Sequence, residues 1–320
     1  MIEVLESARK VCERAREIRI NRAVLESTAR KMAAEKAAPP PWDTRHHFFD
    51  GGEKTVAYFL VLDTLNFCFW PLPETPRWEI DFKGGKISGY HAMAAALKKA
   101  MEAGIPLYDA RWLAGVTEGQ LMEVLGGRGV LQLMERRAVA LNELGSVLIE
   151  FYGGEAHELV EAAGGSAQGL ARLLADKLPS FRDVAEYEGE PVYFYKRTQI
   201  FPSDLHGAFE GKAWGAFMDI DRLTAFADYK LPQVLRQLGI LEYSPELSRL
   251  VDRCGYLEAG SAVEVEIRAG TVWAVDLLRR ELEKEGHPMA ARDIDWVLWN
   301  MGQQDRFRKQ PYHRTVTIYY

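Results

Sequence analysis

Short helical segments separated by glycines fill the middle of the chain and limit the folds that it can adopt. Between residues 107 and 180, segments with apolar residues at helical spacing alternate with glycine pairs at 126–127, 153–154 and 164–165. Glycine directly after the last apolar position commonly ends a helix, because it adopts the left-handed backbone conformation without steric cost. The pairs do not follow a strand in a G-x-G-x-x-G pattern, so a phosphate-binding loop is not indicated. This stretch therefore predicts an array of short helices.

The rest of the chain predicts more helices and a few short strands. Alternating residues around Gly84-Gly85 predict a β-hairpin over 78–90. We predict a mainly α protein with small β-ribbons, folded as one compact domain over 1–320. Further elements are expected as helices over 2–37 (in two pieces), 91–104 and 292–305, as strands that turn into helices over 190–209 and 263–282, and as a closing strand over 315–320.

Charge and cysteine content exclude several classes of protein. The chain has 40 Lys and Arg against 46 Asp and Glu, which gives a net charge of −6. A protein that binds duplex nucleic acid usually carries a basic surplus, so polymeric nucleic acid is not an expected partner. A single nucleotide remains possible, because one or two cations in a pocket neutralise its phosphate. Three widely spaced cysteines without a CxxC motif indicate neither a disulfide framework nor a zinc site.

The longest apolar run, at 55–71, is too short and too interrupted to span a bilayer. We expect it to be a buried helix or strand. Its two polar residues, Asp63 and Asn66, should bond within the core or line a pocket, because buried polar groups need partners. The N-terminal stretch is charged throughout and does not have the pattern of a signal peptide. We therefore expect a cytoplasmic, monomeric protein without a membrane partner.

One acid in an aromatic stretch is the first candidate for chemistry. Asp228 lies between Phe226 and Tyr229, directly before an amphipathic helix that we predict from Pro232 to a stop at Gly239. A carboxylate in this position is either a desolvated catalytic group or a structural acid that caps the helix or forms a salt bridge. The spacing alone favours the structural interpretation, because most buried acids are structural.

Two other patterns could bind a ligand. The adjacent His46 and His47 have no carboxylate partner at a suitable spacing, so we predict no metal site there; one of them faces a pocket or both lie on the surface. Lys196 and Arg197 follow an aromatic run where a strand turns into a helix, so they either bind a phosphate with nearby backbone N–H groups or are solvated. A second pair of this kind is His313-Arg314.

The helix expected over 292–305 carries four residues whose side chains could bind a ligand, and their spacing places them partly on one face. They are Asp295, Trp296, Trp299 and Asn300. Aromatic side chains fill cores but also stack on flat ligands. For Trp299 we expect core packing.

Long segments of the chain resemble one known family, the queuosine salvage proteins. The similarity extends from about Trp42 to the last residue. The resemblance implies hydrolysis of queuosine 5′-phosphate to release queuine, without a metal or another cofactor, and a helical array like that of helix-hairpin-helix DNA glycosylases. Residues 231–239 are faintly similar to the hairpin motif of those enzymes. The segments that carry the resemblance are LDTLNFCFWP (62–71), ISGYHAMAAALKKAMEAGIP (87–106), VYFYKRTQIFPSDL (192–205), FADYKLPQVLRQLG (226–239), EVEIRAGTVWAVDLLR (264–279) and PYHRTVTIYY (311–320).

The resemblance also implies roles for individual residues. The catalytic aspartate of the family falls on Asp228, where a carboxylate can stabilise or attack an oxocarbenium-like transition state. Phe226 and Tyr229 would exclude water from it. The histidine that contacts queuine falls on His47 in the pattern H-F-F-D-G, with His46 as the alternative. Positions that hold the base fall on Asp295, Trp296 and Asn300, and some relatives have an acid in place of the last of these.

Two other functions remain open at this point. One is a glycosylase that acts on damaged bases in DNA, and the other is a protein that binds queuine or its nucleotide without a reaction. The net charge of −6 argues against the first. The second predicts binding that survives the loss of Asp228 and no product.

Overall fold

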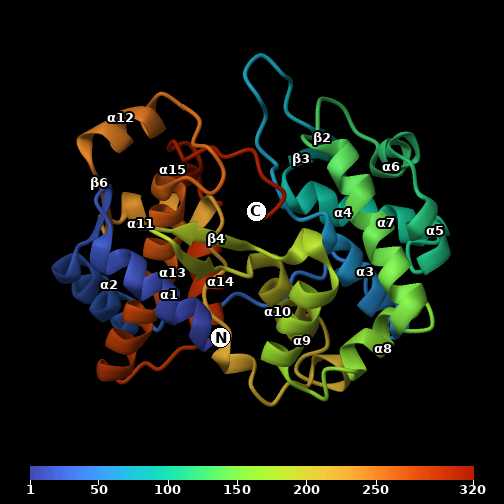
Figure 1. Ribbon diagram of the computed structural model, residues 1–320, viewed down its shortest axis with the longest axis horizontal. Helices are drawn as coiled ribbons and strands as arrows, with labels where there is room; N and C mark the ends of the chain where they lie inside the picture. Colours follow the sequence, from blue (N-terminus) through green and yellow to red (C-terminus); the bar gives the residue numbers. More distant parts are fainter.

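The computed structural model describes residues 1–320, and helices dominate it (Figure 1). Three short 3-10 helices, Pro179–Phe181, Ala213–Gly215 and Ile220–Arg222, connect some of the α-helices. The α-helices are α1 (Ile2–Arg14), α2 (Arg22–Ala34), α3 (Glu53–Thr64), α4 (Tyr90–Glu102), α5 (Ala110–Gly115), α6 (Glu118–Leu125), α7 (Met134–Phe151), α8 (Ala156–Glu161), α9 (Ala167–Lys177), α10 (Lys196–Ala208), α11 (Lys230–Gln237), α12 (Pro245–Asp252), α13 (Ala262–Lys284), α14 (Ala291–Met301) and α15 (Asp305–Arg308).

Six short strands form three separate antiparallel pairs, so the structure confirms a mainly helical protein with small β-ribbons. In the predicted hairpin, Ile80 lies opposite Ile87, and the turn between the strands contains Gly84 with a positive φ. The pairs are β1 (Ile18–Ile20) with β6 (Leu241–Tyr243), β2 (Glu79–Phe82) with β3 (Gly85–Ser88), and β4 (Val184–Tyr187) with β5 (Glu190–Tyr193). The glycine pairs after α6, α7 and α8 all have positive φ, as expected for residues that end helices.

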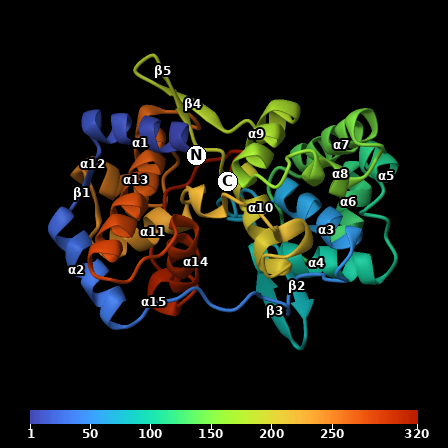
Figure 2. The ribbon, with the colours of Figure 1, turned by 90° about the horizontal axis from the view of Figure 1, so that it is seen from below.

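The two ends of the chain build one half of the molecule, and its middle builds the other. In both ribbon views α1 and α2 lie beside the C-terminal helices α11–α15, while α3–α8 occupy the opposite side and α9 and α10 lie between them (Figures 1 and 2). The larger apolar core includes Val4 of α1 and Val265 of α13 as well as residues of α3 and α4. A second core joins α2, α11, α13 and α14. No helix is both long enough and apolar enough to cross a membrane.

The predicted strand at the start of 263–282 was wrong, because these residues form the first turns of α13. Charged and apolar residues alternate in this stretch, and this alternation predicted a strand. In fact Glu264, Glu266 and Arg268 are all buried. Glu266 accepts hydrogen bonds from the N–H of Glu17 at 2.7 Å and from the Tyr187 hydroxyl at 2.8 Å. A helix that is buried on every side loses the apolar stripe that identifies a surface helix.

The closing strand predicted for 315–320 was also wrong. The tail is irregular, and contacts to other parts of the chain hold it instead of a strand ladder. The Tyr320 carbonyl accepts from the N–H of Cys68 at 2.9 Å, and its hydroxyl donates to Glu264 at 2.7 Å. Residues 231–239 form α11 and its end, not a turn between two helices, so they do not build a hairpin motif. The two helical pieces predicted over 2–37 are confirmed, with β1 between them.

Gly145 allows α5 and α7 to pack with their backbones in contact. A Cβ atom at this position would lie 2.3 Å from the Ala114 nitrogen and 2.5 Å from the Ala110 oxygen. We expect Gly145→Ala to lower the free energy of unfolding by about 1–3 kcal/mol, the usual cost of overpacking. Gly119 in α6 is the matched control, since a Cβ there meets nothing within 4 Å. Gly119→Ala should leave stability unchanged or raise it by up to about 1 kcal/mol. Equal urea unfolding midpoints for the two variants would contradict this packing.

Candidate active site

A cavity of about 680 Å³ lies where the two halves of the molecule meet. Its size is that of a typical site for a small molecule or nucleotide. It has walls from both halves and from α10 between them. The lining segments are the loops at 39–42, 66–70 and 88–89, the first turn of α4, the inner face of α10, the irregular stretch 226–229, the start of α11, and α14.

Asp228 lines this cavity, and its carboxylate also caps the start of α11. Its Oδ1 accepts the N–H groups of Lys230 at 2.7 Å and Leu231 at 2.9 Å. No protein group donates to Oδ2, although the carboxylate is buried. Burial raises the pKa of Asp228, while Lys196 and the two N–H groups oppose this rise. The chain thus fixes the carboxylate by one oxygen and leaves the other to a ligand.

The structure separates Lys196 from Arg197. Lys196 lines the cavity, and its Nζ donates to the Asn66 carbonyl at 3.1 Å. Burial lowers its pKa to about 8 in spite of the nearby Asp228, Asp63 and Asp183 carboxylates. Arg197 points away from the cavity. Its guanidinium donates to the carbonyls of Thr64, at 2.7 Å, and of Ser180.

The phosphate role that we predicted for Arg197 is therefore wrong, because its donors hold backbone carbonyls together. The second predicted pair is not a phosphate site either. His313 is buried with Nε2 at 3.3 Å from the Tyr320 hydroxyl, and neither it nor Arg314 lines the cavity.

Three tryptophans form an aromatic wall of the cavity. Trp296 stacks on Trp299, with ring centroids 5.6 Å apart and an angle of 3° between the planes. Trp42 stacks on the other side of Trp296 at 6.0 Å and 17°. Trp299 packs against the second apolar core, as expected, and also lines the cavity beside Trp296. Trp42 follows a run of prolines in the sequence, and nothing in that run showed that the loop crosses α10 and α14.

Asp295 ties α14 to the stretch that carries Asp228. Its Oδ2 accepts the N–H of Phe226 at 2.7 Å, and both residues line the cavity with Tyr229. Burial raises the pKa of Asp295 well above its usual range. The Phe226 N–H opposes this rise, and the nearby Asp228 and Asp204 carboxylates add to it. Asn300, which we predicted to hold the base, does not reach the cavity, because it faces its own helix and donates to the Trp296 carbonyl at 2.8 Å.

His47 is the buried member of the histidine pair and stands behind the cavity wall. Its Nδ1 lies 2.7 Å from the Asp43 carbonyl oxygen, and its Nε2 lies 2.9 Å from the Tyr90 hydroxyl. His47 does not line the cavity, whereas Tyr90 does. Burial lowers the pKa of His47 to about 4. His47 therefore contacts the cavity lining through its hydrogen bond with Tyr90 and by stacking on Trp42, with ring centroids 5.0 Å apart.

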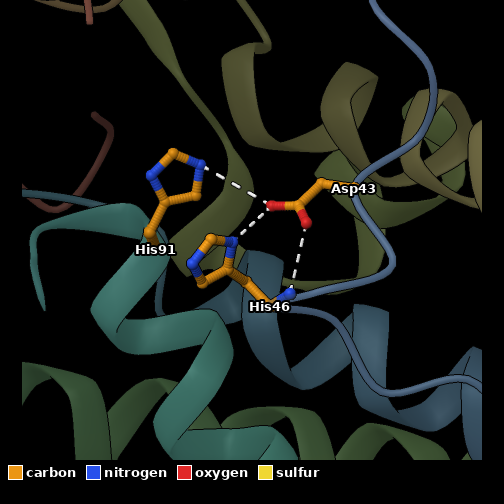
Figure 3. Close-up of side chains that lie close together, drawn as sticks. All are labelled: Asp43, His46 and His91. Atoms are coloured by element: carbon orange, nitrogen blue, oxygen red, sulfur yellow. Dashed lines mark hydrogen bonds and ion pairs between the residues drawn. The ribbon is translucent and has the colours of Figure 1, made fainter. Parts of the chain in front are cut away.

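His46 belongs to a separate cluster with Asp43 and His91 (Figure 3). The carboxylate partner that the sequence did not reveal is Asp43, whose Oδ2 lies 2.6 Å from His46 Nδ1 and 3.8 Å from His91 Nε2. These three groups have the chemistry of metal ligands. However, two ligands bound to one zinc ion at about 2.0–2.2 Å lie roughly 3.3 Å apart, so 2.6 Å indicates a shared proton. Asp43 and His46 therefore form a hydrogen-bonded pair that packs beside His91 at the cavity wall.

The cavity has a positive end that the sequence did not indicate. Arg77, Lys230 and Arg308 all line it, and none of the three forms an ion pair with a carboxylate. Lys230 Nζ donates only to Gln233, at 2.9 Å. Its pKa is lowered to about 8 by burial and by the charges of Arg308 and Arg77, against the effect of Asp228. Three cations that lie together without an ion pair form a candidate site for an anion.

Comparison with known proteins shows similarity along almost the whole chain. A family model described as queuosine salvage protein matches residues 46–320. The queuosine 5′-phosphate N-glycosylase/hydrolase of Sphaerobacter thermophilus is 47% identical over 317 residues, which cover 99% of this chain and 97% of that protein. The protein of the same name from Dictyostelium discoideum is 40% identical and covers 84% and 79%. That of Mus musculus is 36% identical and covers 98% of both chains.

The geometry of the Asp43 cluster predicts that zinc does not bind there. We expect the melting temperature of the untagged protein to be the same with 100 µM Zn²⁺ (roughly 100 times the Kd of a micromolar site) and with a chelator. Ligand at about 100 times its Kd would stabilise the fold by about 2.7 kcal/mol, which a thermal scan detects easily. A zinc-dependent rise that Asp43→Ala abolishes would show instead that the cluster is a metal site.

Proposed function

The chain belongs to the queuosine salvage protein family, and on that premise we propose that it hydrolyses the N-glycosidic bond of queuosine 5′-phosphate. The products are queuine, for salvage into tRNA modification, and ribose 5-phosphate. The observation that carries this proposal is the buried Asp228 carboxylate, which is fixed through one oxygen and open to the cavity through the other. The names of the relatives supply the substrate.

Asp228 suits the transition state of this reaction. When the bond between base and ribose breaks, positive charge develops at the anomeric carbon. A carboxylate held by two N–H groups stabilises that charge without reorganising, and its effect is stronger where little water is present. Phe226 and Tyr229 flank it and keep water away. Lys196 favours the ionised form of Asp228, which is the form that the reaction needs.

The charges around the cavity match those of the proposed substrate. The positive end at Arg77, Lys230 and Arg308 would bind the 5′-phosphate. Lys230 is two residues from Asp228, so the phosphate and the anomeric carbon lie near the same turn. Asp295 and Asp204 line the cavity as acceptors for the N–H groups of queuine. The wall of Trp42, Trp296 and Trp299 offers an apolar aromatic surface for the base.

We also propose that the protein acts as a cytoplasmic, single-domain monomer on the free nucleotide, without a metal, another cofactor or polymeric nucleic acid. Support comes from the net charge of −6 and from a cavity whose walls all belong to one chain. The larger apolar core, which includes α1, α4 and α13, supports a single domain. The proposed relation to helix-hairpin-helix DNA glycosylases rests on the family resemblance, because residues 231–239 form a helix.

Replacing the catalytic acid tests the proposed function directly. We expect Asp228→Asn to slow the release of queuine from queuosine 5′-phosphate by about 100-fold or more, the effect of removing a main electrostatic contact. The amide oxygen can still accept the N–H groups of Lys230 and Leu231, so α11 keeps its cap. The measurement is chromatography with mass detection of both products.

The control is Asp221→Asn, which removes an exposed acid from the same part of the chain and should leave the rate unchanged. Wild-type protein that binds the nucleotide and releases no base would favour the binding-protein alternative. An Asp228→Asn variant with full activity would move the catalytic acid elsewhere.

The positive end of the cavity predicts selective binding of the phosphate. We expect Arg77→Met to raise the KM for queuosine 5′-phosphate by about 10–100-fold, since a charged hydrogen bond contributes about 1.5–3 kcal/mol. The same variant should hydrolyse the nucleoside queuosine as wild type does. Arg136 is exposed on α7, and Arg136→Met is the matched control that should change neither value. An equal loss with nucleotide and nucleoside would show that Arg77 does not contact the phosphate.

A further inference from the structure

A chain of hydrogen bonds runs from the buried His47 through Tyr90 to Asp204 at the cavity. His47 Nε2 lies 2.9 Å from the Tyr90 hydroxyl, and that hydroxyl lies 3.2 Å from Asp204 Oδ2. Asp204 and Tyr90 both line the cavity that contains Asp228, whereas His47 does not. Neither Tyr90 nor Asp204 was singled out by the sequence, and no role for either has emerged so far beyond that of Asp204 as one acid of the wall.

Counting the protons in this chain fixes the state of Asp204. A carbonyl only accepts, so His47 Nδ1 must carry the proton that it shares with the Asp43 carbonyl at 2.7 Å. His47 is buried and neutral, with a pKa lowered to about 4, so its Nε2 has no proton and must accept one from Tyr90. Tyr90 has a single hydroxyl proton, which this bond uses. Its oxygen can then only accept from Asp204, and the contact is a hydrogen bond only when Asp204 is a carboxylic acid.

The surroundings of Asp204 also favour the neutral acid. Asp63 Oδ2, on the neighbouring α3, is buried without a hydrogen-bond partner. Burial raises the pKa of Asp204 to about 7, while the hydrogen bond with Tyr90 and the charge of Lys196 lower it. Titratable groups from four helices interact with Asp204, namely Tyr58 and Asp63 of α3, Tyr90 of α4, Lys196 of α10 and Asp295 of α14.

We propose that Asp204 is the general acid of the reaction and that Tyr90 and His47 are positioning residues that keep it protonated. The inference rests on the proposed function and adds a second catalytic residue to it. In the step, the bond between the anomeric carbon and the base breaks, and its electron pair stays on the base. Asp204 gives its proton to one heteroatom of the base that is conjugated with the breaking bond. Asp204 then becomes a carboxylate.

The remaining atoms balance with one water molecule. Its oxygen joins the anomeric carbon, and its released proton passes to Asp228 and then to solvent. Asp204 regains a proton from solvent through the open cavity. An acid in this position is needed because queuine is a 7-deazaguanine and has no N7 that could be protonated before the bond breaks. While Asp204 is ionised, the single Tyr90 proton cannot be donated to both His47 and Asp204. One hydrogen bond is then lost, and this favours the return of a proton to Asp204.

The test compares two leaving groups on one ribose 5-phosphate. We expect Asp204→Asn to slow queuine release by about 10²–10⁴-fold, the usual effect of removing a general acid. The same variant should cleave the 4-nitrophenyl riboside 5-phosphate at a rate close to that of wild type, because 4-nitrophenolate leaves without a proton. Asp228→Asn should be slow with both substrates. Activity on the nitrophenyl substrate also shows that the Asp204→Asn variant is folded.

The pH profile tests the positioning residues. Because the acid form is the active one, kcat for queuosine 5′-phosphate should fall as the pH rises above about 7. That alkaline limb should be absent in Asp204→Asn. In His47→Phe, Tyr90 is free to donate to the Asp204 carboxylate, which stabilises the ionised form, so the limb should move to lower pH.

Equal slowing of both substrates by Asp204→Asn would overturn the general-acid role, as would a variant as fast as wild type with queuosine 5′-phosphate. If the alkaline limb of the kcat profile lies at the same pH in His47→Phe as in wild type, the positioning role of Tyr90 and His47 is overturned. These results leave the proposed function standing. Wild-type protein that cleaves neither substrate would refute the proposed function itself.

Discussion

The buried ion pair between Asp183 and Arg268 holds the parts of the active site in place. Arg268 of α13 donates through both terminal nitrogens to the two Asp183 oxygens, at 2.9 and 2.6 Å. Its Nε donates to the Ala227 carbonyl at 3.2 Å, directly before Asp228. Asp183 Oδ2 also accepts the N–H of Lys196 at 3.1 Å, at the start of α10. One ion pair therefore fixes both the segment that carries Asp228 and the start of the helix that carries Lys196.

These contacts are needed because the stretch that carries Asp228 has no regular structure of its own. Residues 223–229 form neither helix nor strand, so side chains of other elements satisfy their backbone groups. Gln199 accepts the Thr224 N–H at 2.8 Å, and Asp295 accepts the Phe226 N–H at 2.7 Å. Removing one partner of a buried ion pair costs about 3–5 kcal/mol, because the other charge is left alone. Contacts to other elements therefore hold this stretch in place.

The same buried charges explain what could be predicted from the sequence. Helices with glycine ends, the hairpin at 78–90 and the cap before α11 depend on local patterns, and the structure confirms them. Asp228 could be singled out because an aromatic stretch and a helix start surround it. The start of α13 was misread, because Glu264 and Arg268 have buried partners that lie far away in the chain. Arg77 and Arg308 look like ordinary surface arginines until the fold places them together.

Four buried carboxylates, on Asp63, Asp204, Asp228 and Asp295, interact with the buried ammonium group of Lys196. They cannot all be ionised at low dielectric, so their hydrogen bonds decide which ones are. Asp228 accepts two N–H groups and has Lys196 nearby, and both favour its charged form. Burial raises the pKa of Asp204 to about 7, although its hydrogen bond with Tyr90 and the charge of Lys196 lower it. With Asp228 ionised and Asp204 protonated, as we propose, one cavity holds both a carboxylate and a proton donor near neutral pH.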